Sequence, residues 1–222
     1  MSEQTPYNPL DKVNLGQSVT QALFETEIHP LNDTERVKGA GIYAIYYTGD
    51  FPAYGRVSDK NRDGKFDQPI YVGKAIPKGG RKGGLGPVIT SSTALRSRLR
   101  KHATSVEQVS NLDIRHFHYR WLVVDDIWIP LGENMLIEQF KPIWNVVIDG
   151  FGNNDPGSRR SAQYKSSWDV LHPGRAFAAK LADSGLKPEV IVARIENYLA
   201  GRSVPLIEPE TEEVDENDVT EE

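Results

Sequence analysis

Two short runs of β-forming residues constrain the fold of this chain more than any other feature. GAGIYAIYYTG at 39–49 begins and ends with glycine, and PIYVGK at 69–74 begins with proline. Both runs are rich in isoleucine, valine and tyrosine, which favour strands, whereas glycine and proline favour the turns that bound strands. A third strand is predicted at 114–125, where aromatic and apolar residues alternate with polar ones. The sequence therefore predicts at least three short strands.

Helices are predicted around these strands. Ser92 or Thr93 can cap a helix over 94–102, and Leu136, Ile137 and Phe140 form an apolar stripe in a segment that stops before a proline. The predicted helices are a short one before Pro30 and the segments 94–102, 131–140, about 174–183 and 188–200. Two segments are predicted to be irregular: a polar insertion at 50–68 and a loop rich in glycine, lysine and arginine at 75–92.

The length of 222 residues suits one well-buried core with extensions. We expect an N-terminal arm with a short helix at 1–36, a catalytic domain at 37–150, a basic and aromatic segment with helices at 151–205 and a disordered acidic tail at 206–222. The chain has no cysteine, which excludes disulfides, thiol catalysis and cysteine-bound zinc. It has neither a signal-like start nor the ~20 consecutive apolar residues of a membrane helix, so we expect a cytoplasmic protein.

The charge of the chain is divided between two regions. Nine acidic and no basic side chains lie at 207–222, so the rest of the chain carries 26 basic against 22 acidic residues, although the whole has a net charge of -5. Between Asp67 and Glu107 there are eight basic residues and no acidic one. Such clustering is typical of a surface that binds the phosphates of a nucleic acid, although an ordinary solvated surface is the alternative. The eight are Lys74, Lys78, Arg81, Lys82, Arg96, Arg98, Arg100 and Lys101.

The side chains needed to cut a phosphodiester follow one another along the chain. Arg98 and His102 are four residues apart in a predicted helix, so a permanent cation lies one turn from a titratable imidazole. Cleavage needs a base for the attacking water, a cation for the charge that grows on the phosphate and a carboxylate to hold Mg²⁺. The candidates in chain order are Tyr43, Tyr71, Arg98, His102 and Glu133.

The motifs occur in a fixed order: GIY, then YVG, then Arg98 and His102, then Glu133 on a predicted helix and Asn145 after a proline. In this order the chain resembles the GIY-YIG nucleases over about 39–147. The resemblance implies an α+β fold in which a small antiparallel sheet is flanked by helices. It is closest to the type II restriction endonucleases of this family that cut CCGCGG, and that likeness extends to about Arg175 through DGFGN at 149–153, Trp168-Asp169 and HPGR at 172–175. The 27 residues between Tyr43 and Tyr71 exceed the usual gap, but the restriction branch carries such insertions.

The resemblance also assigns roles to individual residues. Tyr43 would be the general base and His102 would accept its proton. Arg98 would hold a phosphate oxygen, and Tyr71 would either bond to the phosphate or orient the water. Glu133 would bind a single Mg²⁺. Asn145 is expected to be a hydrogen-bonding brace. DNA contacts are expected from the basic residues Lys74, Lys78, Arg81, Lys82, Arg96, Arg100, Lys101, Arg159 and Arg160.

We therefore expect a Mg²⁺-dependent endonuclease that cuts double-stranded DNA at a palindrome as a homodimer and is paired with a cognate DNA methyltransferase. Three alternatives remain open from the sequence. One is a homing or structure-selective repair nuclease of the same family, and another is a non-catalytic DNA-binding protein on this scaffold. The third is a calcium-regulated binding module.

Two other patterns favour metal binding weakly. Residues 59–67 follow the first nine positions of an EF-hand loop, but Ile70 stands where a bidentate glutamate is required. His116 and His118 share one face of a predicted strand without a third ligand nearby in sequence, so we expect them to be structural.

Overall fold

The protein is built on one antiparallel sheet, as the sequence predicted. The computed structural model describes residues 8, 10–77, 89–155 and 163–205. Its sheet has the order β1-β4-β2-β3 and every neighbouring pair of strands is antiparallel. The strands are β1 (His29–Pro30), β2 (Gly41–Tyr47), β3 (Tyr71–Ala75) and β4 (Phe117–Val123). The two-residue β1 was not predicted, and its proline is tolerated because β1 lies at an edge of the sheet.

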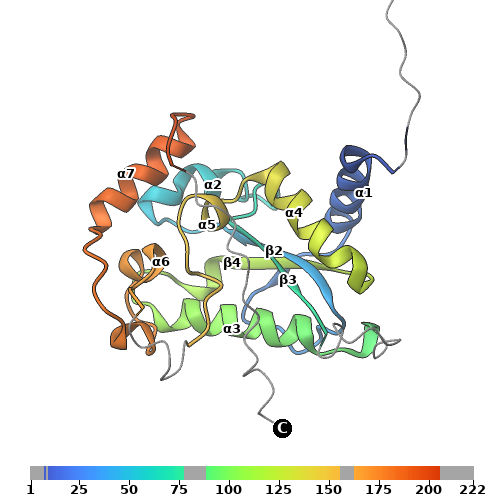
Figure 1. The fold of residues 1–222 in the computed structure, drawn as a ribbon, viewed down its shortest axis with the longest axis horizontal. Coiled ribbons are helices and arrows are strands. Elements are labelled where there is room, and N and C mark those ends of the chain that lie inside the picture. Colours follow the sequence, from blue (N-terminus) through green and yellow to red (C-terminus); the bar gives the residue numbers. More distant parts are fainter. Residues whose placement is uncertain (1–7, 9, 78–88, 156–162, 206–222) are drawn as a thin grey trace, which may run out of the picture.

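Helices cover both faces of the sheet, so the fold is α+β (Figure 1). The helix α3 (Ala94–Gln108) packs on one face, where Leu95 and Leu99 share a buried cluster with Tyr43 and Ile45 of β2. The opposite face is covered by α1 (Lys12–Phe24) and α4 (Ile129–Phe140). All seven residues of β2 are buried because this strand is central and covered on both faces.

Helix α3 is longer than predicted. The predicted segment 94–102 extends to Gln108, and no side-chain cap bond is made by Thr93. Instead, Oγ of Ser92 accepts a hydrogen bond of 3.2 Å from the N–H of Ala94. The helix therefore carries Arg98 in its first half and His102 just past its middle, with further turns after them.

The insertion between β2 and β3 contains a 3-10 turn at Pro52–Tyr54 and the short helix α2 (Gly55–Asp59). The side chain of Asn61 is fully buried and bonds to the backbone: its amide donates to the carbonyls of Tyr47 (3.0 Å) and Gln68 (2.8 Å), and its oxygen accepts from the N–H of Gln68. Asn61 is the third residue of the EF-hand-like sequence at 59–67. In the structure its side chain braces the insertion against β2.

The predicted helix at about 174–183 is wrong. That segment forms only a 3-10 turn at Ala178–Lys180, and the helix α6 lies earlier, at Ser167–Leu171. The alanines favour a helix, but two tertiary contacts outweigh this propensity. The side chain of Arg175 is buried in an ion pair with Asp169, and Ala182 forms a parallel β-bridge with Tyr164.

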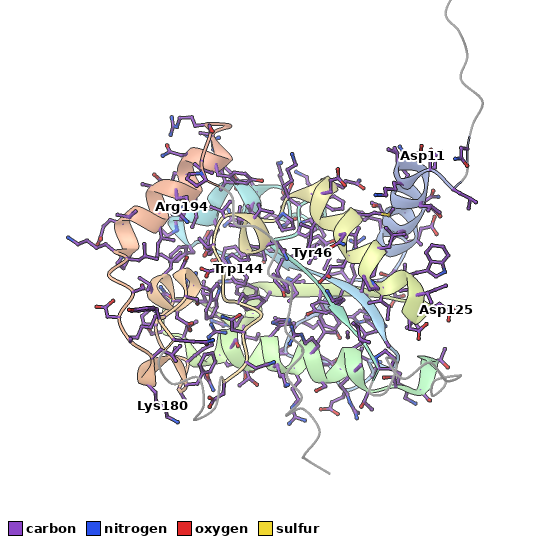
Figure 2. All side chains as sticks on the ribbon, viewed as in Figure 1. Asp11, Tyr46, Asp125, Trp144, Lys180 and Arg194 are labelled. Carbon is purple, nitrogen blue, oxygen red and sulfur yellow. The ribbon has the colours of Figure 1, made fainter. Side chains whose placement is uncertain are left out.

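The other C-terminal elements are α5 (Ile143–Val146) and α7 (Pro188–Leu199), the latter as predicted. Phe151, Trp168 and Ile191 belong to the same buried cluster as Tyr43, so residues beyond 150 complete the core on the α3 face. Trp144 of α5 lies in the interior, whereas Asp125 and Lys180 lie at the periphery (Figure 2). Short 3-10 turns occur at Ile89–Ser91, Ile114–His116 and Asp126–Trp128.

Within the described ranges, no helix combines the length and the apolar character needed to cross a membrane. Several predictions concern residues outside those ranges: the acidic tail, most of the loop at 75–92, and Lys78, Arg81, Lys82, Arg159 and Arg160. The domain boundaries stay a prediction.

Candidate active site

The two sequence runs that define the sheet meet at Gly73. In the β2–β3 pair, Gly73 lies directly opposite Tyr43, and Tyr71 lies opposite Ile45. A Cβ at Gly73 would lie 2.4 Å from Oη of Tyr43 and 2.9 Å from the ring of Tyr71. Since such distances are far below van der Waals contact, the ring of Tyr43 can lie across β3 only because position 73 has no side chain.

Helix α3 brings His102 to the hydroxyl of Tyr43. Oη of Tyr43 lies 2.6 Å from Nε2 of His102, and both side chains are buried. Burial lowers the pKa of His102 well below its usual range, and the positive charges of Arg98, Arg175 and Lys101 lower it further. The imidazole is therefore neutral at neutral pH.

Tyr71 and Arg98 border the same space. The rings of Tyr71 and His102 have their centroids 5.1 Å apart, and those of Tyr43 and Tyr71 are 6.3 Å apart. A Cβ at Gly152 would lie 2.8 Å from Oη of Tyr71 and 3.8 Å from a guanidinium nitrogen of Arg98. The structure thus brings together four of the five predicted chemical residues on the α3 face of the sheet.

Glu133 belongs to the other face. Its helix α4 packs closely on β2, since a Cβ at Gly132 would lie 3.3 Å from the side chain of Ile42. Oε2 of Glu133 lies 2.6 Å from Nζ of Lys74, and Glu133 is only 8% exposed. Lys74 follows Gly73 on β3 and so points to the opposite face from Tyr71. Because β3 is an edge strand, both groups of side chains adjoin one edge of the sheet.

Asn145 holds that edge strand. Its Oδ1 accepts a hydrogen bond from the N–H of Val72, and its amide donates to the carbonyl of Val72, each over 2.8 Å. A neighbouring strand would bond to the same N–H and C=O of Val72, so the Asn145 side chain takes the place of a strand there. This is the geometry of a brace that fixes β3, and with it Tyr71 and Lys74.

The basic residues of the predicted DNA-binding surface have different surroundings. Lys74 is paired with Glu133, and a guanidinium nitrogen of Arg96 lies 3.9 Å from a carboxylate oxygen of Glu35 on an exposed surface. Arg100 of α3 is exposed, while Lys101 is half-buried. Positive charge therefore follows α3 beside the pair of Tyr43 and His102.

Two residues at this site were not predicted as functional from the sequence. Phe151 stacks on His102, with centroids 4.6 Å apart and planes at 17°, and Arg175 bonds to the loop that carries Phe151. The segments DGFGN and HPGR contain both residues and marked the likeness to the restriction enzymes. No periodicity or charge cluster distinguishes them in the sequence.

The described residues include no group of three or more histidine, cysteine, aspartate or glutamate side chains that could hold a metal ion. Glu133 is the buried carboxylate beside β3, so a cation there would take one protein carboxylate and complete its shell with water and phosphate oxygens. Mg²⁺ is bound in this way in many phosphoryl-transfer sites.

A family model, the Eco29kI GIY-YIG domain, matches residues 35–199. A search of curated proteins finds no match. The matched range includes every strand except β1, the pair of Tyr43 and His102, and α4 with Glu133. The chain therefore belongs to the Eco29kI GIY-YIG domain family and is a DNA endonuclease.

Proposed function

We propose that this endonuclease is a Mg²⁺-dependent type II restriction enzyme that cuts double-stranded DNA at the palindrome CCGCGG. The observation that carries the proposal is the contact between Tyr43 and His102 beside Tyr71, in a chain of this family. The palindrome rests on the likeness of the segments at 142–153 and 168–175 to enzymes that cut this site.

Tyr43 removes the proton from the attacking water. A tyrosine hydroxyl with an ordinary pKa near 10 is only about 0.1% ionised at pH 7, so it needs an acceptor for its own proton. When Nδ1 of His102 carries the ring proton, the lone pair of Nε2 faces the Tyr43 hydroxyl at 2.6 Å. Burial keeps this imidazole neutral, and a neutral imidazole can take the proton as it leaves Tyr43.

Arg98 and Tyr71 bind the phosphate that is attacked. The guanidinium of Arg98 stays charged at all relevant pH values and donates to nonbridging oxygens, where negative charge grows during the reaction. The hydroxyl of Tyr71 donates to the same group. Because Gly152 has no side chain, no Cβ lies against the Tyr71 hydroxyl beside Arg98.

Glu133 would hold the Mg²⁺, which when bound supplies positive charge beside the leaving 3′ oxygen. Lys74 lies against the same carboxylate and adds a cation at the edge of β3. A phosphodiester at this edge would lie near Tyr71 and Arg98 on one side and Lys74 with Glu133 on the other.

A palindrome presents two equivalent scissile bonds, so we further propose that the enzyme acts as a homodimer with one site per strand. An enzyme of this kind also requires a methyltransferase that protects the same sequence in the host.

The first test is digestion of two plasmids that differ only in one CCGCGG site. We expect cleavage of the plasmid with the site, in Mg²⁺ and not in EDTA, and sequencing of the ends gives the cut positions. Cleavage of both plasmids at scattered positions would contradict the proposed specificity.

Glu133→Gln tests the metal role. We expect the single-turnover rate to fall by about 10³-fold or more, because a bound metal ion contributes several kcal/mol to the barrier and 1.36 kcal/mol corresponds to tenfold. DNA affinity, measured by fluorescence anisotropy in EDTA, should stay within about threefold, a change below 1 kcal/mol.

The matched control is Glu138→Gln, an exposed position on the same helix, which should keep the parent rate. Equal losses of affinity and rate in Glu133→Gln would assign Glu133 to DNA binding or to folding instead.

A further inference from the structure

The loop at 149–153 packs directly against the proposed catalytic side chains. The ring of Phe151 stacks on His102 and lies 5.0 Å from the ring of Tyr71. The next residue, Gly152, lies so close to the Tyr71 hydroxyl that a Cβ would be 2.8 Å from it. A small displacement of this loop would therefore move the His102 ring and change the space around the Tyr71 hydroxyl.

This loop lacks regular secondary structure, so its carbonyl groups need donors other than those of a helix or sheet. The N–H of Asn153 donates to the carbonyl of Gly150 at 3.2 Å, and Arg175 supplies further donors. Its guanidinium donates to the carbonyl oxygens of Gly150 at 2.7 Å, Phe151 at 3.3 Å and Asn153 at 3.4 Å. One side chain thus spans the loop.

The guanidinium is itself held in one orientation. Asp169 accepts from Nε at 2.7 Å and from Nη2 at 2.8 Å, and the two side chains are 0% and 1% exposed. The ring of Trp168 lies 4.5 Å from the guanidinium carbon and that of Phe177 lies 4.7 Å from it. Oγ of Ser166 donates to the second carboxylate oxygen of Asp169.

Stability alone is a weak reason for such a pair. Removing two charges from water is costly, and apolar residues of similar volume often serve a core equally well. A buried, bidentate and stacked arginine does something that apolar residues cannot, because it fixes the positions of several carbonyl oxygens at once.

We propose that Arg175, oriented by Asp169, is a positioning residue for DNA cleavage. It holds the loop so that Phe151 keeps the His102 ring against Tyr43, and so that Gly152 leaves room beside the Tyr71 hydroxyl. This inference rests on the proposed function, in which Tyr43, His102 and Tyr71 carry out the chemistry.

The test compares Arg175→Lys with Arg194→Lys. Lysine keeps the charge beside Asp169 but has no planar fork to reach three carbonyls. Arg194 of α7, labelled in Figure 2, also donates to a carbonyl, that of Val147 at 3.5 Å, which precedes the loop. Displacing a catalytic group by ~1 Å can cost ~10²-fold in rate, so we expect Arg175→Lys to lose about 10-fold to 10²-fold in single-turnover rate.

Two further measurements separate positioning from general damage. DNA affinity should stay within about threefold, a change below 1 kcal/mol, and the NMR signal of the His102 ring, identified by its loss in His102→Gln, should shift because Phe151 no longer stacks on it. Arg194→Lys should leave rate, affinity and signal unchanged. An unchanged rate, or an unchanged His102 signal, in folded Arg175→Lys would overturn the proposal.

Gly152→Ala examines the same loop without touching the ion pair, so it applies even if Arg175→Lys does not fold. Its backbone is not in the left-handed region, so an added methyl group perturbs only the space beside Tyr71. We expect a rate loss of about 10²-fold. The control is Gly55→Ala, where a Cβ would meet nothing within 4 Å. A normal rate in Gly152→Ala would contradict the proposal.

The NMR signal is measured on the protein without DNA. If the parent protein did not cut CCGCGG but Arg175→Lys still shifted the His102 signal, the proposed specificity would fail while the structural coupling held. If the parent cut and the signal did not shift, the coupling would fail by itself.

Discussion

The core contains two tyrosine–histidine pairs with the same local geometry and different surroundings. In each, a tyrosine hydroxyl lies 2.6 Å from Nε2 of a buried histidine: Tyr43 with His102, and Tyr54 with His172. Burial lowers the pKa of both histidines, that of His172 to about 3. The contact itself therefore does not distinguish a catalytic pair from a structural one.

In the second pair, both side chains have further hydrogen-bond partners. The indole N–H of Trp144 donates to Oη of Tyr54 at 3.0 Å, and Nδ1 of His172 lies 2.9 Å from Oδ1 of Asn111. If Nδ1–H donates to Asn111, Nε2 accepts the Tyr54 hydroxyl, and each group is satisfied. Trp168 and Phe51 pack against the imidazole.

The first pair instead lies beside other polar side chains of the site. Gly73 lets the ring of Tyr43 lie across β3, Gly152 packs at the hydroxyl of Tyr71, and the half-buried Arg98 lies near enough to lower the pKa of His102. The difference teaches that a second tyrosine and a nearby cation, rather than the contact itself, make a common buried pair a candidate catalytic one.

Tyr43→Phe should separate the two pairs most sharply. It keeps the ring and removes the hydroxyl, and general-base catalysis is typically worth ~10²–10⁴-fold, so we expect a loss of that size in the single-turnover rate at saturating enzyme. DNA binding should be nearly normal. A rate within a few-fold of the parent would show that the pair of Tyr43 and His102 is as structural as the other one.

Tyr71→Phe should have a smaller effect than Tyr43→Phe. The Tyr71 hydroxyl is proposed to donate to the phosphate, and a hydrogen bond to a charged group is worth about 1.5–3 kcal/mol, which corresponds to about 10-fold to 10²-fold in rate. The two variants are compared in one single-turnover assay. The reverse order of effects would assign the base to Tyr71.

Tyr54→Phe should destabilise the fold and leave the rate intact. It removes a hydroxyl that bonds to both Trp144 and His172, and buried groups left without a partner cost about 1–3 kcal/mol. We expect urea unfolding to show a loss of about 2 kcal/mol. A large rate loss in folded Tyr54→Phe would mean that both pairs act in catalysis.

His172→Gln should weaken the acid sensitivity of the fold. In the unfolded chain a histidine has a pKa of ~6.5, whereas in the fold the pKa of His172 is about 3. Between these values the unfolded chain binds a proton that the folded chain does not, so the unfolding free energy falls as the pH falls.

His102, with its own lowered pKa, acts in the same direction. Between pH 7.5 and 5.5 we expect the variant to lose roughly 1 kcal/mol less than the parent in urea unfolding. Identical pH slopes would mean that His172 is accessible to protons in the fold.

Much of the sheet was predictable because its signals are local. GIYAIYY and YVG carry β-forming residues between turn residues, and the chain order of the candidate chemical residues pointed to the family. The stripe of Leu136, Ile137 and Phe140 likewise placed α4 to within two residues at its start. These features depend on neighbours in sequence.

The missed features depend on contacts that local periodicity does not encode. The segment at 174–183 has helical propensity, but the buried bond between Arg175 and Asp169 and the bridge between Ala182 and Tyr164 determine its path. Glu133 lies beside Lys74, on the opposite side of β3 from Tyr71, because of the way α4 packs on the sheet. Neither a buried ion pair nor the packing of a helix on a sheet can be derived from local pattern.

The brace at Asn145 also bears on self-association. An edge strand exposes backbone groups that can recruit a strand from another molecule and seed aggregates. The outward groups at the start of β3 are already engaged. Asn145 bonds both N–H and C=O of Val72, and the N–H of Trp144 donates to the carbonyl of Ile70, just before the strand, at 3.0 Å. The strand that carries Tyr71 can thus lie at the edge of the sheet while this stretch of its edge is closed to β-strand addition.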